Sequence, residues 1–211
     1  MKLYGFSRSS AAFRVRIALN LKGIEWEHIN ISLPDGDQFG DDYKRLNPQA
    51  RVPTLIDGET ALYQSMAILE YLDETHPDPP FLPADPAARA RVRGLADIIA
   101  CDIHPLNNLA VLKFLSREME KDKNAVNVTW YQHWIAEGFN ALEAHLAADS
   151  DTGKFAHRDA PGLVDICIVP QAFNAQRYEC DLSGYPTIMR IFDECMKLKA
   201  FDSAQPSQQH D

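Results

Sequence analysis

The sequence predicts two domains of different class, an α/β domain followed by an all-helical domain. Over residues 1–80, short strand-like runs alternate with helical patterns in the order β-α-β-α-β-β-α. Five prolines then crowd into residues 77–86, and the remainder shows the periodicity of long helices. The length of 211 residues suffices for two small domains that each bury a core.

Within residues 1–80, turn and cap residues mark where elements begin and end. Ser9-Ser10 precedes a helical pattern, and Gly23 is a plausible helix stop. Asp57-Gly58 between two short apolar runs indicates an antiparallel hairpin, whereas strands joined by crossovers are expected to be parallel. The predicted elements are a strand at 2–7, a helix from Ser9-Ser10 to Gly23, a strand at 25–33, a short helix at 41–46, strands at 54–56 and 61–63, and a helix from Gln64-Ser65 to His76.

The prolines cannot continue a helix, so residues 81–85 are predicted to be a proline-rich linker. Asp85-Pro86 is a typical helix start and opens the helical domain, predicted over 86–202. We expect helices from 86 to about 117 with a kink at His104-Pro105, and at 126–148, 162–176 and 186–199. The helix at 162–176 is apolar all round, which predicts a buried position. The segment 203–211 is polar and is predicted to be a disordered tail.

Composition and charge exclude several function classes. The net charge of −9, from 21 basic and 30 acidic residues, argues against a nucleic-acid partner. No apolar run is long enough for a transmembrane helix, so no membrane partner is expected. Four cysteines without a CxxC pair predict reduced thiols in a cytoplasmic protein. Cys101 and His104 are spaced to share a metal ion, but no third ligand stands near them, so no metal site is expected. Dinucleotide, P-loop and nucleophile-elbow motifs are absent.

Residues 1–24 carry five basic residues and no acid. Such a segment on an anionic protein suggests a site for a small anion. A solvated helix face explains the same pattern, and charge alone favours that explanation.

Three short motifs follow or precede the strands of the α/β domain. Ser9-Ser10 and Gln64-Ser65 start helices, where free N–H groups stabilise an anion, although helix capping is the commoner use of such residues and is favoured for each pair taken alone. Val52-Pro53 precedes a strand, and a cis bond there would let the backbone face a ligand, although a trans strand entry is commoner. Their shared location at strand ends of one open sheet is more informative than any single motif.

Together these residues resemble the zeta-class glutathione transferases, which include maleylacetoacetate isomerases and bacterial maleylpyruvate isomerases. The resemblance covers nearly the whole chain. It is carried by Ser7–Leu19, Leu46–Pro48, Val52–Leu55, Gln64-Ser65, Asp102–Asn108, Val169–Gln171 and Asn174–Tyr178. It implies a thioredoxin-like glutathione-binding domain over 1–80, a glutathione-transferase helical domain after it, glutathione as cofactor, and a homodimer.

The resemblance also implies roles for individual residues. The catalytic positions are Ser9 and Ser10, which face the glutathione thiol. The remaining positions are Gln38, Val52, Pro53, Gln64, Ser65, His104 and Asn108 for glutathione, and Arg8 and Arg177 for the carboxylates of a dianionic substrate. Arginine suits a carboxylate because its planar fork binds both oxygens, but a surface ion pair is a serious alternative for Arg177.

The activity implied is glutathione-dependent cis–trans isomerisation of a maleyl dicarboxylate, maleylacetoacetate to fumarylacetoacetate, in aromatic amino-acid catabolism. The thiolate adds to the cis double bond, the resulting single bond rotates, and elimination restores a trans double bond and free glutathione. Maleylpyruvate isomerase, a general glutathione transferase acting on α-haloacids, and a non-catalytic interaction module remain alternatives.

Two positions depart from the family pattern. Ala11 replaces the usual Cys after the serine pair, so thiolate stabilisation must come from a serine hydroxyl and the helix start. Ser9 is favoured as the serine that donates to the thiolate because it lies at the end of the strand, whereas Ser10 is expected to cap the helix. Gly162 replaces a Ser or Thr cap three residues before Asp165, which leaves half of a capping box. The Val52–Pro53 bond is predicted to be cis.

Overall fold

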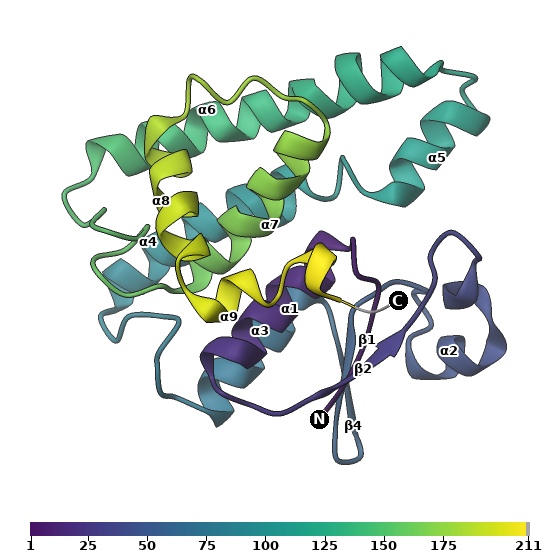
Figure 1. The fold of residues 1–211 in the computed structure, drawn as a ribbon, viewed down its shortest axis with the longest axis horizontal. Coiled ribbons are helices and arrows are strands. Elements are labelled where there is room, and N and C mark those ends of the chain that lie inside the picture. The colour runs from purple at the N-terminus through teal and green to yellow at the C-terminus, as the bar shows by residue number, and fades with distance from the viewer. Residues whose placement is uncertain (210–211) are drawn as a thin grey trace. The chain divides into compact units, whose positions relative to one another are not determined.

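In the computed structural model, which describes residues 1–209, the chain divides into two units. The first unit comprises Met1–Phe81 together with the C-terminal segment that begins at Met196. The second unit is Leu82–Cys195. Strands occur in the first unit, and the described second unit contains helices and loops alone (Figure 1). The predicted fold class, an α/β domain followed by a helical domain, is therefore confirmed.

The sheet of the first unit has four strands in the order β2-β1-β3-β4. The central strand β1 (Lys2–Gly5) pairs in parallel with β2 (Glu27–Asn30). On its other side, β1 pairs antiparallel with β3 (Thr54–Asp57), which forms the hairpin with β4 (Thr60–Tyr63). The predicted parallel crossover and antiparallel hairpin are both present.

The helices of the first unit supply most of its core. Helices α1 (Ser10–Leu21) and α3 (Ser65–Thr75) pack against one another (Figure 1). The short α2 (Asp41–Leu46) follows a 3-10 turn, η1 (Asp37–Phe39). Apolar side chains of both long helices and of the central strands are at most 1% exposed, among them Leu3, Phe13, Ile17, Leu55, Leu69 and Leu72. This packing fixes where each helix begins relative to the sheet.

The cationic segment near the N-terminus differs from a solvated helix face. Arg14 is 1% exposed and Arg16 is fully buried, so both guanidinium groups lie inside the first unit. Arg16 donates from Nε to the Ala204 carbonyl oxygen at 2.9 Å and from Nη2 to the Ser7 carbonyl oxygen at 2.8 Å. Burial of a cation needs such partners because desolvation of an unpaired charge is costly.

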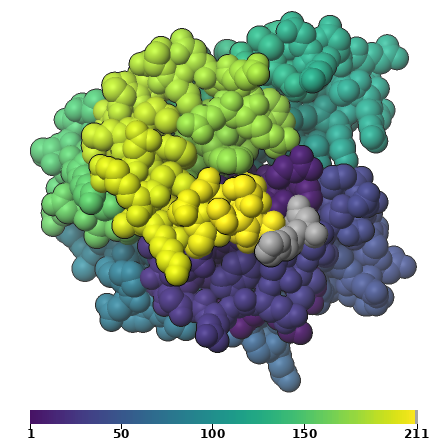
Figure 2. Space-filling model, in the orientation of Figure 1, coloured from purple at the N-terminus to yellow at the C-terminus, as the bar shows by residue number. Residues whose placement is uncertain are grey.

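The C-terminal segment returns to the first unit and lies against α1 (Figure 2). Helix α9 (Lys199–Asp202) buries Phe201 completely, and Ala204 is 1% exposed. A 3-10 turn, η4, follows at Pro206–Gln208. Residues 203–209 therefore differ from the disordered tail predicted from Ser203, because the polar composition hid one buried apolar residue, Ala204, whose carbonyl oxygen accepts from Arg16. Residues 210 and 211, also assigned to that tail, lie outside the described residues.

The second unit contains α4 (Pro86–Asp97), η2 (Ile98–Ile103), α5 (Leu109–Arg117), η3 (Ala125–Gln132), α6 (His133–Ala148), α7 (Leu163–Arg177) and all but the last residue of α8 (Pro186–Met196), where η2 and η3 are π-helical. The predicted kink at His104-Pro105 is a full break, because helical structure ends at Ile103 and resumes at Leu109. Helix α7 buries most of its residues on all sides, as its composition predicts. Within residues 1–209, no helix combines the length and apolar character needed to span a membrane.

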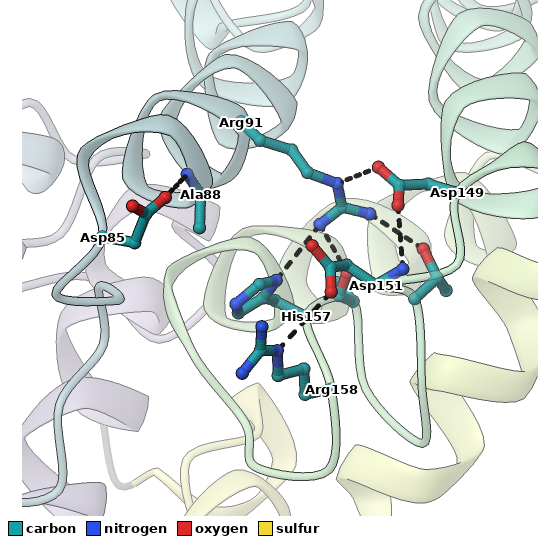
Figure 3. A network of polar contacts seen from close by, with 9 residues as sticks. Asp85, Ala88, Arg91, Asp149, Asp151, His157 and Arg158 are labelled. Atoms are coloured by element: carbon teal, nitrogen blue, oxygen red, sulfur yellow. Dashed lines mark hydrogen bonds and ion pairs between the residues drawn. The ribbon is translucent and has the colours of Figure 1, made fainter.

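A polar network ties the loop between α6 and α7 to α4 (Figure 3). Arg91 of α4 pairs with Asp149, donates to Thr152 Oγ1 at 2.9 Å and donates to the Ala156 carbonyl oxygen at 3.2 Å. At the end of this loop, Asp165 accepts from the Ala156 N–H at 2.9 Å and from the Gly162 N–H at 2.8 Å. The loop is thereby held at the start of the buried helix α7.

Candidate active site

The strand register brings four loops of the first unit to one end of its sheet. Gly5, the last residue of β1, lies opposite Asn30, the last residue of β2. Thr54, the first residue of β3, lies between Tyr4 of β1 and Tyr63 at the end of β4. The segments that follow β1, β2 and β4 therefore emerge at the same end at which the chain enters β3. These are the segments that carry the predicted glutathione residues of this unit.

Ser9 and Ser10 mark the start of α1, with roles opposite to those expected for capping. Ser9 is the N-cap, and its Oγ accepts from the Ala12 N–H at 3.3 Å. Ser10 is the first helical residue and is 6% exposed. The expectation that Ser10 caps the helix is therefore wrong. Ser9 keeps its hydroxyl proton for donation, because a hydroxyl group accepts and donates at once.

Gln38 lies in η1, in the loop that follows β2. Its side chain is 5% exposed, and its Oε1 has no hydrogen-bond donor among the described residues. A buried carboxamide oxygen without a donor is costly, since it loses water and gains nothing in exchange. A ligand that supplies an N–H group here would remove that cost, which fits the peptide backbone of glutathione.

The turn before β3 presents the Val52 backbone. The Val52–Pro53 bond is cis, as predicted, and a second cis bond at Asp78–Pro79 was not predicted. The Arg51 carbonyl oxygen accepts from Tyr43 Oη at 2.6 Å and from Asn47 Nδ2 at 2.9 Å. Burial raises the pKa of Tyr43, which keeps this hydroxyl group protonated and able to donate. Within residues 1–209, no hydrogen bond is found at the N–H or C=O of Val52, so its backbone is available to a peptide ligand.

Gln64 and Ser65 form the start of α3. Gln64 has φ of 68°, a left-handed value that is strained for a residue other than glycine. Its exposed carboxamide donates from Nε2 to Gln49 Oε1 at 2.9 Å and does not cap the helix. Ser65 is 6% exposed and its Oγ accepts from Arg14 Nη1 at 3.3 Å. The strained residue and the uncapped helix start coincide at Gln64-Ser65, two of the residues predicted to bind glutathione.

Arg8 and Arg177, the predicted carboxylate ligands, are exposed and belong to different units. The Arg8 guanidinium lies 5.3 Å from the centre of the Phe6 ring, directly before the Ser9 cap. The Arg177 guanidinium lies 5.5 Å from the centre of the Tyr178 ring at the end of α7. Among the described residues neither side chain forms an ion pair. The alternative of a surface ion pair for Arg177 is therefore not supported.

His104 and Asn108 lie in the second unit, in the break between η2 and α5. Asn108 is the N-cap of α5, and its Oδ1 accepts from the N–H groups of Ala110 at 2.9 Å and Val111 at 3.3 Å. Its Nδ2 donates to the Pro105 carbonyl oxygen. The carboxamide of Asn108 is thus engaged within its own loop, and sequence reasoning missed this capping role.

Three residues that position the site were also missed. Tyr43 and Asn47 hold the turn before Val52, and Arg14 contacts Ser65. The excess of basic residues over residues 1–24 is the signal that could have found Arg14, since it indicated a local cationic function. Nothing in the spacing of Tyr43 and Asn47 indicates that both contact one carbonyl oxygen.

Comparison with known proteins agrees with this arrangement. The family model of the glutathione S-transferase N-terminal domain matches residues 8–75. Maleylacetoacetate isomerase of Mus musculus is 46% identical over 212 residues, which covers 99% of this chain and 94% of that protein. A holo structure of maleylpyruvate isomerase, a bacterial glutathione S-transferase of the zeta class, is 45% identical, superposes with a TM-score of 0.98, and the match covers 100% of this chain and 99% of that one.

A structure of maleylacetoacetate isomerase from Methylobacterium extorquens AM1 with bound malonate and glutathione is 41% identical, with a TM-score of 0.96. That match covers 100% of this chain and 98% of the other. Identity at this level over the full length shows common descent, and these relatives are enzymes. The chain therefore belongs to the zeta class of the glutathione transferases.

Proposed function

We propose that this protein is a glutathione-dependent cis–trans isomerase of a maleyl dicarboxylate, converting maleylacetoacetate to fumarylacetoacetate. One observation carries the proposal: Arg8, a cation without an acidic partner among the described residues, directly precedes the serine that caps α1. The proposed partner of a substrate carboxylate, Arg8, and the hydroxyl group proposed to donate to the glutathione thiolate, that of Ser9, are therefore adjacent in the chain. The relatives with the same overall structure carry the names of such isomerases.

The residues of the first unit fit glutathione as a cofactor. The buried Oε1 of Gln38 needs a donor, and the Val52 peptide group is available for backbone pairing. Ser65, with Gln64 before it, stands at an uncapped helix start that favours an anionic group. Donors, acceptors and a helix N-terminus thus match the peptide groups and the glutamyl carboxylate of the tripeptide.

When bound, glutathione supplies a thiolate that adds to the double bond of the substrate and leaves again after rotation. A free thiol has a pKa of about 8.5, so only a few per cent is ionised at neutral pH. The Ser9 hydroxyl donates toward the thiol sulfur, and the start of α1 contributes its positive dipole end. Lowering the thiol pKa by about two units corresponds to roughly 2.7 kcal/mol of stabilisation of the thiolate.

Arg8 and Arg177 are proposed to bind the two carboxylates of the substrate. The net charge of −9 disfavours the approach of a dianion at long range, so local cations have to compensate. Arg8→Ala and Arg177→Ala are expected to raise KM for the dicarboxylate while glutathione binding stays near normal. An unchanged KM in both variants would remove the carboxylate assignment.

Maleylpyruvate is the second candidate substrate, because the solved maleylpyruvate isomerase is as similar to this chain as the mouse maleylacetoacetate isomerase. Turnover of maleylacetoacetate, maleylpyruvate and an α-haloacid, each with and without glutathione, separates the candidates. Greater kcat/KM for maleylacetoacetate supports the proposal, and greater kcat/KM for maleylpyruvate or the haloacid replaces it. Absence of turnover with all three, despite glutathione binding, would favour the non-catalytic interaction module.

We further propose a homodimeric protein of the cytoplasm that serves aromatic amino-acid catabolism. None of the four cysteines is joined in a disulfide, which fits a reducing compartment. The homodimer follows from membership in the zeta class, and sedimentation of the purified protein at micromolar concentration tests it. A monomer under those conditions would overturn the assembly proposal without affecting the isomerase proposal.

A further inference from the structure

Arg14 is a buried cation whose hydrogen bonding is incomplete. Its side chain rises from α1 and is 1% exposed. Nη1 donates to Ser65 Oγ at 3.3 Å, whereas Nε and Nη2 have no partner among the described residues. A guanidinium group carries five N–H donors, so one long hydrogen bond leaves most of its capacity unused.

The neighbouring Arg16 is a second buried arginine of the same helix, and two of its nitrogens have carbonyl partners, although its Nη1 has none among the described residues. It donates to the carbonyl oxygens of Ala204 and Ser7 and thereby joins α1 to two other segments. Arg14 has no such carbonyl partner in residues 1–209, and no carboxylate there pairs with it. Joining α1 to two other segments therefore explains the burial of Arg16, whereas the single long hydrogen bond of Arg14 does not explain the burial of its charge.

The contact between Arg14 and Ser65 directs that charge at the start of α3. Ser65 is the first residue of an 11-residue helix whose N-cap, Gln64, forms no side-chain cap. Because Ser65 Oγ accepts from Arg14, its hydroxyl proton is left to donate to a third group. An anion at this helix start would accept from Ser65, meet the positive end of the helix dipole and lie close to the buried guanidinium.

We propose that Arg14 is a positioning residue for the glutamyl carboxylate of glutathione, which it acts on by orienting Ser65 and by supplying a buried positive charge. This inference rests on the proposed placement of the glutamyl end of glutathione at Ser65. On this inference, Arg14 is the residue that makes the protein bind an ionised glutamyl α-carboxylate more tightly than a neutral group at the same position. Arg14 belongs to α1, and Ser9 is the N-cap of the same helix. The glutamyl end and the thiol of glutathione therefore both depend on where α1 is placed.

The test compares two ligands by calorimetric titration: glutathione, and the analogue in which the glutamyl α-carboxylate is a carboxamide. The wild-type Kd for the carboxamide is expected to exceed that for glutathione by about 10- to 100-fold, which is the loss of affinity expected when a hydrogen bond to a charged group is removed. Arg14→Gln is expected to lose most of this discrimination, with Kd for glutathione rising by a similar factor and Kd for the carboxamide changing little. A merely structural role would lower stability without changing the ratio of the two Kd values.

Two further variants keep the inference falsifiable if Arg14→Gln does not fold. Arg14→Lys keeps the charge but not the planar fork, so it is expected to retain discrimination at lower affinity. Ser65→Ala removes the bonded hydroxyl group, leaves Arg14 in place, and is expected to weaken glutathione binding while retaining part of the discrimination. Equal affinity of the wild type for both ligands, or a wild-type ratio in Arg14→Gln, would overturn the inference. Neither titration contains a maleyl substrate, so failed isomerisation with intact discrimination would refute the isomerase proposal alone.

Discussion

Replacement of Ser9 by alanine removes two interactions that the structure assigns to one hydroxyl group. The first is the N-cap of α1, where Oγ accepts from the Ala12 N–H at 3.3 Å. That distance exceeds the usual N–H···O value of about 2.9–3.0 Å, so the loss should fall in the lower half of the capping range, roughly 0.5–1 kcal/mol. For a protein of 211 residues this corresponds to a fall in Tm of about 1–4 °C.

The second interaction is the proposed hydrogen bond to the thiolate. Ser9→Ala is expected to raise the pKa of bound glutathione by up to about two units, read from the ultraviolet absorbance of the thiolate. The turnover number is expected to fall by roughly one to three powers of ten. Unchanged pKa and unchanged turnover in Ser9→Ala would refute the reasoning. The same losses in Ser10→Ala, with Ser9→Ala unaffected, would exchange the roles of the two serines.

Ser9→Asp separates the two effects. Aspartate is a good N-cap, and the first turn of α1 contains no acidic residue, so its charge is favourable to the helix. Thermal stability should therefore return toward the wild-type value. The same negative charge opposes a thiolate, so the pKa of bound glutathione should rise above that in Ser9→Ala. A variant that regains both stability and the low thiol pKa would show that capping alone prepares the site.

Three further predictions concern the second unit. A Cβ at Gly138 of α6 would lie 2.3 Å from Cδ1 and Cγ1 of the buried Ile103, so Gly138→Ala is expected to lower the free energy of unfolding by about 1–3 kcal/mol. Gly94 in α4 has open space around it, so Gly94→Ala should raise the free energy of unfolding by about 0.5–1 kcal/mol. Equal effects of the two substitutions in denaturant unfolding would contradict this packing. Gly162 has an extended backbone (φ −141°, ψ −158°) that threonine also adopts, so Gly162→Thr should complete the cap of α7 and stabilise by a few tenths to about 1 kcal/mol; a lower Tm would count against the missing cap. Burial raises the pKa of Asp165 to about 6, so the folded state binds this proton more tightly than the unfolded state, and stability from this group is present below about pH 4 and lost as pH rises to 6, by roughly 3 kcal/mol in total. The free energy of unfolding should decrease more from pH 4 to pH 7 in the wild type than in Asp165→Asn. Equal decreases in the two proteins would show that the pKa of Asp165 is not raised.

The sequence predicted the order of elements because each boundary carries a local signal. Asp57-Gly58 specifies the hairpin, and Pro105 ends the helix before it. The capping role of Ser9 was assigned to its neighbour because a serine pair offers two caps one residue apart, and only the packed position of α1 decides between them. The segment after Ser203 was misjudged because its order depends on Arg16, 188 positions from the carbonyl group that it binds.

The candidate site was predictable where a motif sits at a strand end and was not predictable where contacts cross the fold. Ser9, Val52 and Ser65 lie at one end of the sheet, as their positions after or before strands indicate. The contact of Arg14 with Ser65 joins residues 51 positions apart on two helices, and no spacing rule relates them. Burial of the basic residues in α1 could not be foreseen either, since arginine is usually exposed.

The most direct test is the isomerisation of maleylacetoacetate by the purified protein, with glutathione present or absent and free glutathione measured throughout. We expect fumarylacetoacetate to form only when glutathione is present, over many turnovers, with the amount of free glutathione unchanged at the end. Stoichiometric consumption of glutathione, equal rates without it, or no fumarylacetoacetate despite glutathione binding would contradict the isomerase assignment.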